Sequence, residues 1–153
     1  MKILLLGEYS NVHATLAEGL RALGHDVLVV SDEIHADMTL APHHHLPYAM
    51  VSPEARRHSV TLMAPSKAFN MPGIITSYSF VSDPLRRQHF YDYLDRNDIT
   101  MGNIFSYDCL RACYTPEGEE WLNEMLHYVT DNIRYLTDFL AAHCPLIRPM
   151  HTE

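Results

Sequence analysis

Two apolar runs in this chain end abruptly at polar side chains that are capable of chemistry. The runs are Val27–Val30 and Val60–Met63, and a short apolar run bounded in this way is typical of a buried strand in an α/β sheet. Such a sheet presents functional groups where its strands end. The groups here are Asp32 and His35 after the first run and Ser66 and Lys67 after the second. The sequence therefore predicts a site at the edge of a sheet.

The opening of the chain predicts a βαβ unit. Lys2–Leu6 is expected to form a short buried strand that ends at Gly7, and Val27–Val30 forms the second strand. Between them, apolar residues recur at helical spacing from Ala14 to Leu23, and Gly24 is placed as a C-cap. The two strands are therefore expected to be parallel, with a right-handed connection.

The remaining patterns predict one more strand and several helices. We expect a short helix that begins at Ser52-Pro53-Glu54, a fourth strand at 74–81, and helices at 82–97, 102–114 and 117–143. At about 1.5 Å per residue, the last helix would be roughly 40 Å long. The predicted fold class is α/β, with a mostly parallel sheet, flanking helices and a long C-terminal helix.

Composition limits the partners that the chain can bind. The net charge of -8 and the pI of about 5.7 disfavour nucleic acid and anionic membranes, and no cluster of Lys and Arg offsets this charge. The apolar run at 3–6 is too short for a signal peptide or a membrane span. Three cysteines with no C-x-x-C pair fit a reducing compartment. We therefore expect a soluble, cytoplasmic protein with no nucleic-acid or membrane partner.

A lysine directly after a buried strand is unusual. Desolvating an ammonium group is costly unless the group is paired or chemically used. One such use is a Schiff base with pyridoxal phosphate (PLP), whose pyridine nitrogen then faces an acidic residue. Lys67 and Asp32 are the candidates for these two roles. The alternative is that Asp32 caps a turn and that Lys67 is a solvated loop lysine.

Three motifs carry a resemblance to a known family. They are Ser31–Asp37 (SDEIHAD), Ala64–Gly73 (APSKAFNMPG) and Gly118–Leu122 (GEEWL). In order and spacing they resemble the PLP-dependent C-S β-lyases of the aminotransferase class I/II fold, the MalY/PatB-type cystathionine β-lyases. The resemblance covers about residues 27–153, and it implies that this part of the chain is a fragment of an aminotransferase-type large domain.

The resemblance implies a role for each candidate residue. Lys67 would be the catalytic residue, which holds PLP as a Schiff base and then takes the Cα proton of the substrate as a general base. Asp32 would keep the pyridine nitrogen protonated, His35 would lie near the phenolic oxygen, and Ser66 would bind the phosphate. The implied reaction is β-elimination from cystathionine or a cysteine conjugate, which yields pyruvate, ammonia and a thiol. The family's enzymes are homodimers, so self-association is expected here too.

The first 26 residues resemble a different family. Residues 1–26 look like the N-terminal βα unit of a GT-B glycosyltransferase. We therefore interpret 1–153 as a single α/β domain in which this segment is joined to the lyase-like segment 27–153 near Gly24–Val30. In the lyases, the phosphate-binding turn and the stacking aromatic lie upstream of Asp32, and the arginine that binds the substrate carboxylate lies beyond Glu153. Weak PLP binding with weak or no turnover is therefore expected.

Two alternatives to a lyase stay open. The first is a non-catalytic, chimeric or designed α/β fold in which the active-site residues are relics. The second is a fragment of a nucleotide-sugar glycosyltransferase, although Gly7 stands without a G-x-G-x-x-G motif.

A metal site is not expected. Consecutive histidines such as His43-His44-His45 point in different directions, and no second cluster accompanies them. Cys109 and Cys113 share a helix face, where they are better explained as small buried residues than as ligands.

Overall fold

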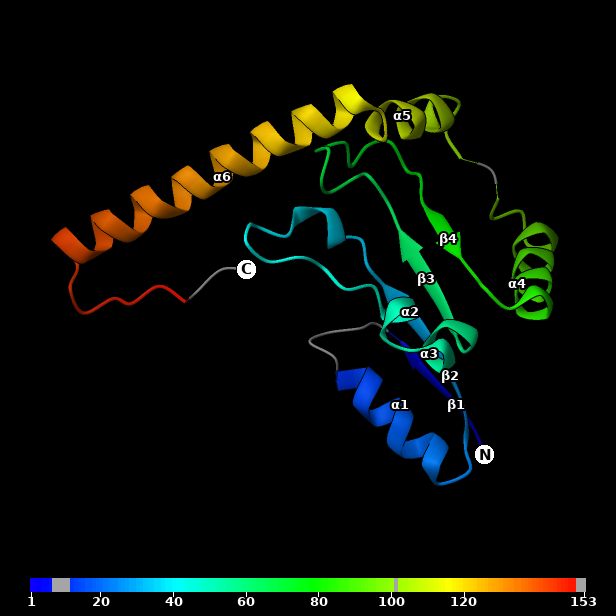
Figure 1. Cartoon of the computed structure of the whole chain (residues 1–153). Helices are drawn as coiled ribbons and strands as arrows, with labels where there is room; N and C mark the ends of the chain where they lie inside the picture. Colours follow the sequence, from blue (N-terminus) through cyan, green and yellow to red (C-terminus); the bar gives the residue numbers. More distant parts are fainter. Residues whose placement is uncertain (7–11, 101, 151–153) are drawn as a thin grey trace.

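The computed structural model describes residues 1–6, 12–100 and 102–150. Its centre is a four-stranded sheet in the order β1-β2-β3-β4 (Figure 1). The strands are β1 (Lys2–Leu6), β2 (Asp26–Asp32), β3 (Ser59–Met63) and β4 (Tyr78–Phe80). The first three are parallel, and β4 pairs with β3 in the antiparallel direction. The prediction of a mostly parallel sheet is confirmed, whereas Gly7 lies outside the described residues.

The helix α1 (Val12–Ala22) connects β1 to β2, as the apolar spacing predicted. It ends at Ala22 and is followed by Gly24, which has a φ of 81°, a left-handed conformation that glycine adopts without steric cost. The amide of Gly24 donates to the carbonyl of Arg21 at 2.8 Å, and the amide of His25 donates to that of Leu20 at 3.1 Å. These bonds satisfy carbonyls at the helix end, so the predicted C-cap is confirmed.

The hydrophobic core lies on one face of the sheet. Its buried residues are Ala17 of α1, Val27 and Val29 of β2, Tyr48 of α2 (Tyr48–Val51) and Ala55 of α3 (Pro53–Arg57). Burying a valine contributes about 1.5–3 kcal/mol. Ser52 caps α3, because its Oγ accepts a hydrogen bond from the amide of Ala55 at 3.0 Å. The short helix predicted at Ser52 is therefore confirmed.

The strand β1 is only partly buried, which corrects the prediction of a buried strand. It pairs with β2 alone, so it lies at the edge of the sheet. Leu4 and Leu6 are 55% and 66% exposed, whereas Ile3 and Leu5 pack against the core. Successive side chains of a strand point to opposite faces, and the core covers only one face of β1.

The fourth strand also differs from its prediction. It was expected over 74–81, but β4 spans only Tyr78–Phe80 and runs antiparallel to β3, with Met63 opposite Tyr78. Before β4, the carbonyl of Ile75 is bonded outside the sheet, because it accepts a hydrogen bond from Ser106 Oγ at 3.3 Å.

Three helices complete the described chain. They are α4 (Pro84–Arg96), α5 (Ser106–Cys113) and α6 (Pro116–His143). Asp83 caps α4 and Thr115 caps α6. The helix α5 begins later than the predicted residue 102, because Asn103 forms a turn in which its Oδ1 accepts a bond from the amide of Phe105 at 2.8 Å. The 28-residue α6 confirms the long C-terminal helix and extends well beyond the sheet (Figure 1).

No helix among the described residues is both long enough and apolar enough to cross a membrane.

Candidate cofactor site at the carboxyl edge of the sheet

The register of β2 and β3 brings the two candidate loops to one edge of the sheet. The strands are parallel, and Asp32 lies opposite Leu62. The amide of Glu33 donates to the carbonyl of Leu62 at 2.9 Å, so the pairing continues to the last residues of both strands. Because parallel strands end at the same edge, the loop after Asp32 and the turn after Met63 leave the sheet side by side.

Asp32 is the last residue of β2, His35 lies in the loop that follows, and both are exposed. Asp32 Oδ1 accepts a hydrogen bond from the amide of Ile34 at 3.3 Å, which is the turn-capping contact that the sequence left open. A carboxylate has further acceptor sites, so this contact still leaves it able to bind another donor. His35 precedes the 3-10 helix η1 (Ala36–Met38), and its φ and ψ are -99° and 0°.

Ser66 and Lys67 lie in a tight turn after β3. The amide of Asn70 donates to the carbonyl of Lys67 at 3.2 Å, and that of Met71 donates to the carbonyl of Ser66 at 3.0 Å. Ala68 is buried, which anchors the turn to the body of the protein, while Lys67 itself is exposed and Ser66 is half-buried. The amine of Lys67 therefore reaches solvent at this edge and bears no cost of burial.

Glu33 is a buried carboxylate that sequence reasoning passed over. Its Oε1 accepts a hydrogen bond from the amide of Tyr48 at 3.0 Å, and its Oε2 lies 2.9 Å from His45 Nε2. These contacts tie the segment of the three histidines to the end of β2. The alternation of the strand indicates the burial of Glu33, because alternate side chains of a strand point to the same face: Ser31 and Glu33 are buried, and Asp32 between them is exposed.

A chain of hydroxyl groups lies beside η1. Tyr78 donates to the hydroxyl of Tyr114 at 2.7 Å, and Tyr114 donates to Asp37 Oδ2 at 2.9 Å. Burial raises the pKa of Tyr114 above its ordinary value, and the hydrogen bonds with Tyr78 and Asp37 raise this pKa further. Burial also raises the pKa of Tyr78. Sequence reasoning assigned no role to either tyrosine.

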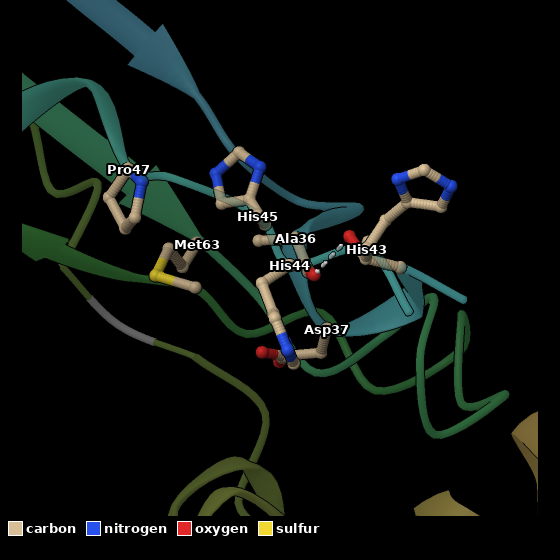
Figure 2. Close-up of a pocket in the computed structure, with 8 residues that line it drawn as sticks. Ala36, Asp37, His43, His44, His45, Pro47 and Met63 are labelled. Atoms are coloured by element: carbon tan, nitrogen blue, oxygen red, sulfur yellow. Dashed lines mark hydrogen bonds between the residues drawn. The ribbon is translucent and has the colours of Figure 1, made fainter. Parts of the chain in front are cut away.

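A cavity of about 290 Å³ opens beside the same loop (Figure 2). It is lined by Ala36, Asp37, Thr39, His43, His44, His45, Pro47 and Met63. Thr39 Oγ1 donates to the carbonyl of Ala36 at 3.1 Å. Within residues 1–6, 12–100 and 102–150, no group of three or more His, Cys, Asp or Glu side chains is placed to hold a metal ion.

Comparisons with known proteins connect the chain to a family. No protein-family model matches the chain. It is 38% identical over 135 residues to cystathionine beta-lyase PatB of Bacillus subtilis, in an alignment that covers 88% of this chain and 35% of PatB. It is 30% identical over 122 residues to protein MalY of Escherichia coli, covering 79% of this chain and 30% of MalY. The chain is related to the MalY/PatB-type C-S β-lyases. The resemblance found in the sequence is confirmed, and the chain spans about a third of the length of these relatives.

Solved structures agree with this relationship. The PLP-bound C-S lyase from Staphylococcus hominis matches with a TM-score of 0.75 and 28% identity, over 95% of this chain and 37% of that one. Cystalysin from Treponema denticola matches with a TM-score of 0.80 over 99% of this chain and 40% of that one, and at 24% identity this likeness shows the fold alone. The chain therefore has an aminotransferase-like α/β fold, as predicted.

The junction near Gly24–Val30, between the glycosyltransferase-like segment and the lyase-like segment, stays a prediction. The alignment with PatB covers 135 residues, which is longer than the segment 27–153, so the similarity to the lyases extends into the first 26 residues.

Proposed function

We propose that the chain binds PLP at the carboxyl edge of the sheet, with Lys67 as the Schiff-base amine. Asp32 would face the pyridine nitrogen, His35 the phenolic oxygen, and Ser66 the phosphate. The observation that carries this proposal is the parallel pairing of β2 and β3, which ends both strands at one edge, so that Asp32 lies at the end of β2 and the other three residues lie on the loops that follow the two strands.

The side chains at this edge fit the chemistry of PLP. The exposed amine of Lys67 is accessible to an aldehyde, and the carboxylate of Asp32 keeps acceptor capacity beside its bond to Ile34. The hydroxyl of Ser66 and the imidazole of His35 supply donors for anionic oxygens. The similar structure from Staphylococcus hominis is described as a PLP-bound C-S lyase.

The reaction that we propose is β-elimination from a sulfur-containing amino acid. The relatives PatB and the Corynebacterium glutamicum protein are both described as cystathionine beta-lyases. When bound, PLP supplies an electron sink next to the substrate Cα. Lys67 would take the Cα proton as a general base, and Asp32 would hold the proton on the pyridine nitrogen. Because Asp32 and Lys67 are exposed, the site excludes little water, and we expect slow turnover.

Self-association is part of the proposal. The long helix α6 has no buried residue among those described, and Tyr135 on it is 72% exposed. Burial of such aromatic side chains drives association in water. We expect a dimer in light scattering at micromolar concentration and a monomer for Tyr135→Glu. A wild-type chain that stays monomeric over the whole concentration range would contradict this expectation.

We also propose that the protein works in a reducing cytoplasm. This is supported by Cys109, Cys113 and Cys144, which are all free thiols in the structure.

A titration with PLP tests the proposed function. The chain has only two lysines, Lys2 and Lys67, and both are exposed, so Lys2→Ala is a matched control for Lys67→Ala. We expect a saturable visible absorption band for the wild type and for Lys2→Ala, and its loss in Lys67→Ala. Equal bands in the two variants would contradict a specific site at Lys67. For the reaction, pyruvate release from cystathionine is expected to be slow and to depend on Lys67.

A further inference from the structure

Tyr114 lies where the loop after β2, the turn after β3 and the strand β4 meet. Its ring packs edge-on against Phe69, with ring centroids 5.8 Å apart, and against Tyr78, with centroids 5.7 Å apart. Its hydroxyl accepts a hydrogen bond from Tyr78 at 2.7 Å and donates one to Asp37 Oδ2 at 2.9 Å. One side chain therefore contacts both segments that carry the candidate cofactor residues.

The bond to Asp37 fixes the loop that carries His35. Asp37 lies in η1, two residues after His35, and the carbonyl of His35 accepts a hydrogen bond from the amide of Met38 at 3.0 Å. The side chain of His35 makes no capping bond to η1. The hydroxyl of Tyr114 thus supplies an anchor at the carboxylate of Asp37, and a bond to a charged acceptor is stronger than a neutral one.

The ring contact with Phe69 fixes the turn that carries Lys67. Phe69 lies two residues after Lys67, and its amide donates to the carbonyl of Pro65 at 2.9 Å. The ring of Phe69 also stacks on Trp121 of α6, with centroids 5.8 Å apart and an interplanar angle of 21°. Phe69 is therefore held between two aromatic rings, and a shift of these rings would move the backbone next to Lys67.

We propose that Tyr114 is a positioning residue that holds the His35 loop and the Lys67 turn at a fixed separation. Its hydroxyl acts on the loop through Asp37, and its ring acts on the turn through Phe69. The effect of Tyr114 on the cofactor rests on the proposed function, whereas its effect on the two segments rests on these contacts alone.

Three variants separate the hydroxyl from the ring. Tyr114→Phe removes the hydrogen bonds of the hydroxyl with Asp37 and Tyr78 and keeps the ring, and Tyr114→Ala removes both the hydroxyl and the ring. Tyr107→Phe is the matched control, because it is the same change on an exposed tyrosine of α5, the helix that ends just before Tyr114.

Hydrogen exchange without added PLP tests the structural half of the proposal. In Tyr114→Phe we expect the amides of 34–38 to exchange about tenfold faster, as loss of a hydrogen bond to a charged group implies, while 65–71 stay unchanged. In Tyr114→Ala both segments are expected to exchange faster, and Tyr107→Phe should match the wild type. Unchanged exchange at 34–38 in Tyr114→Phe would overturn the proposal.

Titration with PLP tests the second half. Tyr114→Phe is expected to weaken PLP binding about tenfold and to shift the pH midpoint of the visible band, while Tyr107→Phe changes neither. If exchange at 34–38 rises and both PLP readouts stay at the wild-type values, Tyr114 has a structural role only and the positioning role is refuted. If the wild type itself shows no specific band, the proposed function fails, and the exchange data still decide whether Tyr114 holds the two segments.

Discussion

Replacing Thr61 by valine should stabilise the protein. Thr61 is 3% exposed and lies on β3 opposite Ser31 of β2, which is 0% exposed. Among the described residues, neither hydroxyl has a hydrogen-bond partner. A buried hydroxyl without a partner costs about 1–3 kcal/mol, because the unfolded chain leaves it bonded to water. Valine has a closely similar shape and is also β-branched, so Thr61→Val removes this cost while it keeps the preference for a strand.

The expected gain is about 1–2 kcal/mol in the free energy of unfolding, or a rise in Tm of roughly 2–8 °C. Urea unfolding followed by circular dichroism measures it. Thr39→Val is the matched control: the hydroxyl of Thr39 donates to the carbonyl of Ala36 at 3.1 Å, so this variant should lose about 1 kcal/mol. A loss of stability in Thr61→Val as large as that in Thr39→Val would refute the reasoning, since it would show that the Thr61 hydroxyl is satisfied.

Three further predictions follow from other parts of the fold. Glu33→Ala should lower the free energy of unfolding in urea by about 2–4 kcal/mol, because it removes one buried and one partly buried hydrogen bond, whereas Glu54→Ala, on an exposed carboxylate, should change it little. Because the pKa of Tyr114 is raised in the folded protein, the phenol loses its proton at a lower pH in the unfolded chain, so the free energy of unfolding falls as the pH rises above about 10. Urea unfolding from about pH 9 to about pH 11 should show a smaller fall of this free energy in Tyr114→Phe than in the wild type. Gly118→Ala should lower Tm, because the added Cβ would overlap the carbonyl oxygen of Cys113. Gly19→Ala, in an open part of α1, should raise the free energy of unfolding by about 0.5–1 kcal/mol, and equal effects of the two substitutions on stability would contradict both expectations.

The parallel part of the sheet was predictable because its signals are local. Val27–Val30 and Val60–Met63 are apolar runs with clear ends, and Gly24 marks the end of the helix between β1 and β2. The placement of Asp32 and Lys67 at one edge then follows from parallel pairing, which needs no knowledge of side-chain contacts.

The parts that were predicted poorly depend on contacts between distant residues. Before β4, Ser106 donates a hydrogen bond to the carbonyl of Ile75, 31 positions away. The exposure of β1 depends on which neighbours cover its outer face. The chain from Tyr78 to Tyr114 and Asp37 joins residues 36 and 77 positions apart, and no local pattern marks such pairs.

The proposal that Lys67 is the specific amine for PLP at the carboxyl edge of the sheet can be tested directly. The protein is reduced with borohydride at limiting PLP, and the adduct is located by peptide mass spectrometry. The other primary amines are those of Lys2 and the N-terminus, and we expect most of the label on Lys67. Label spread evenly over the three amines would contradict it.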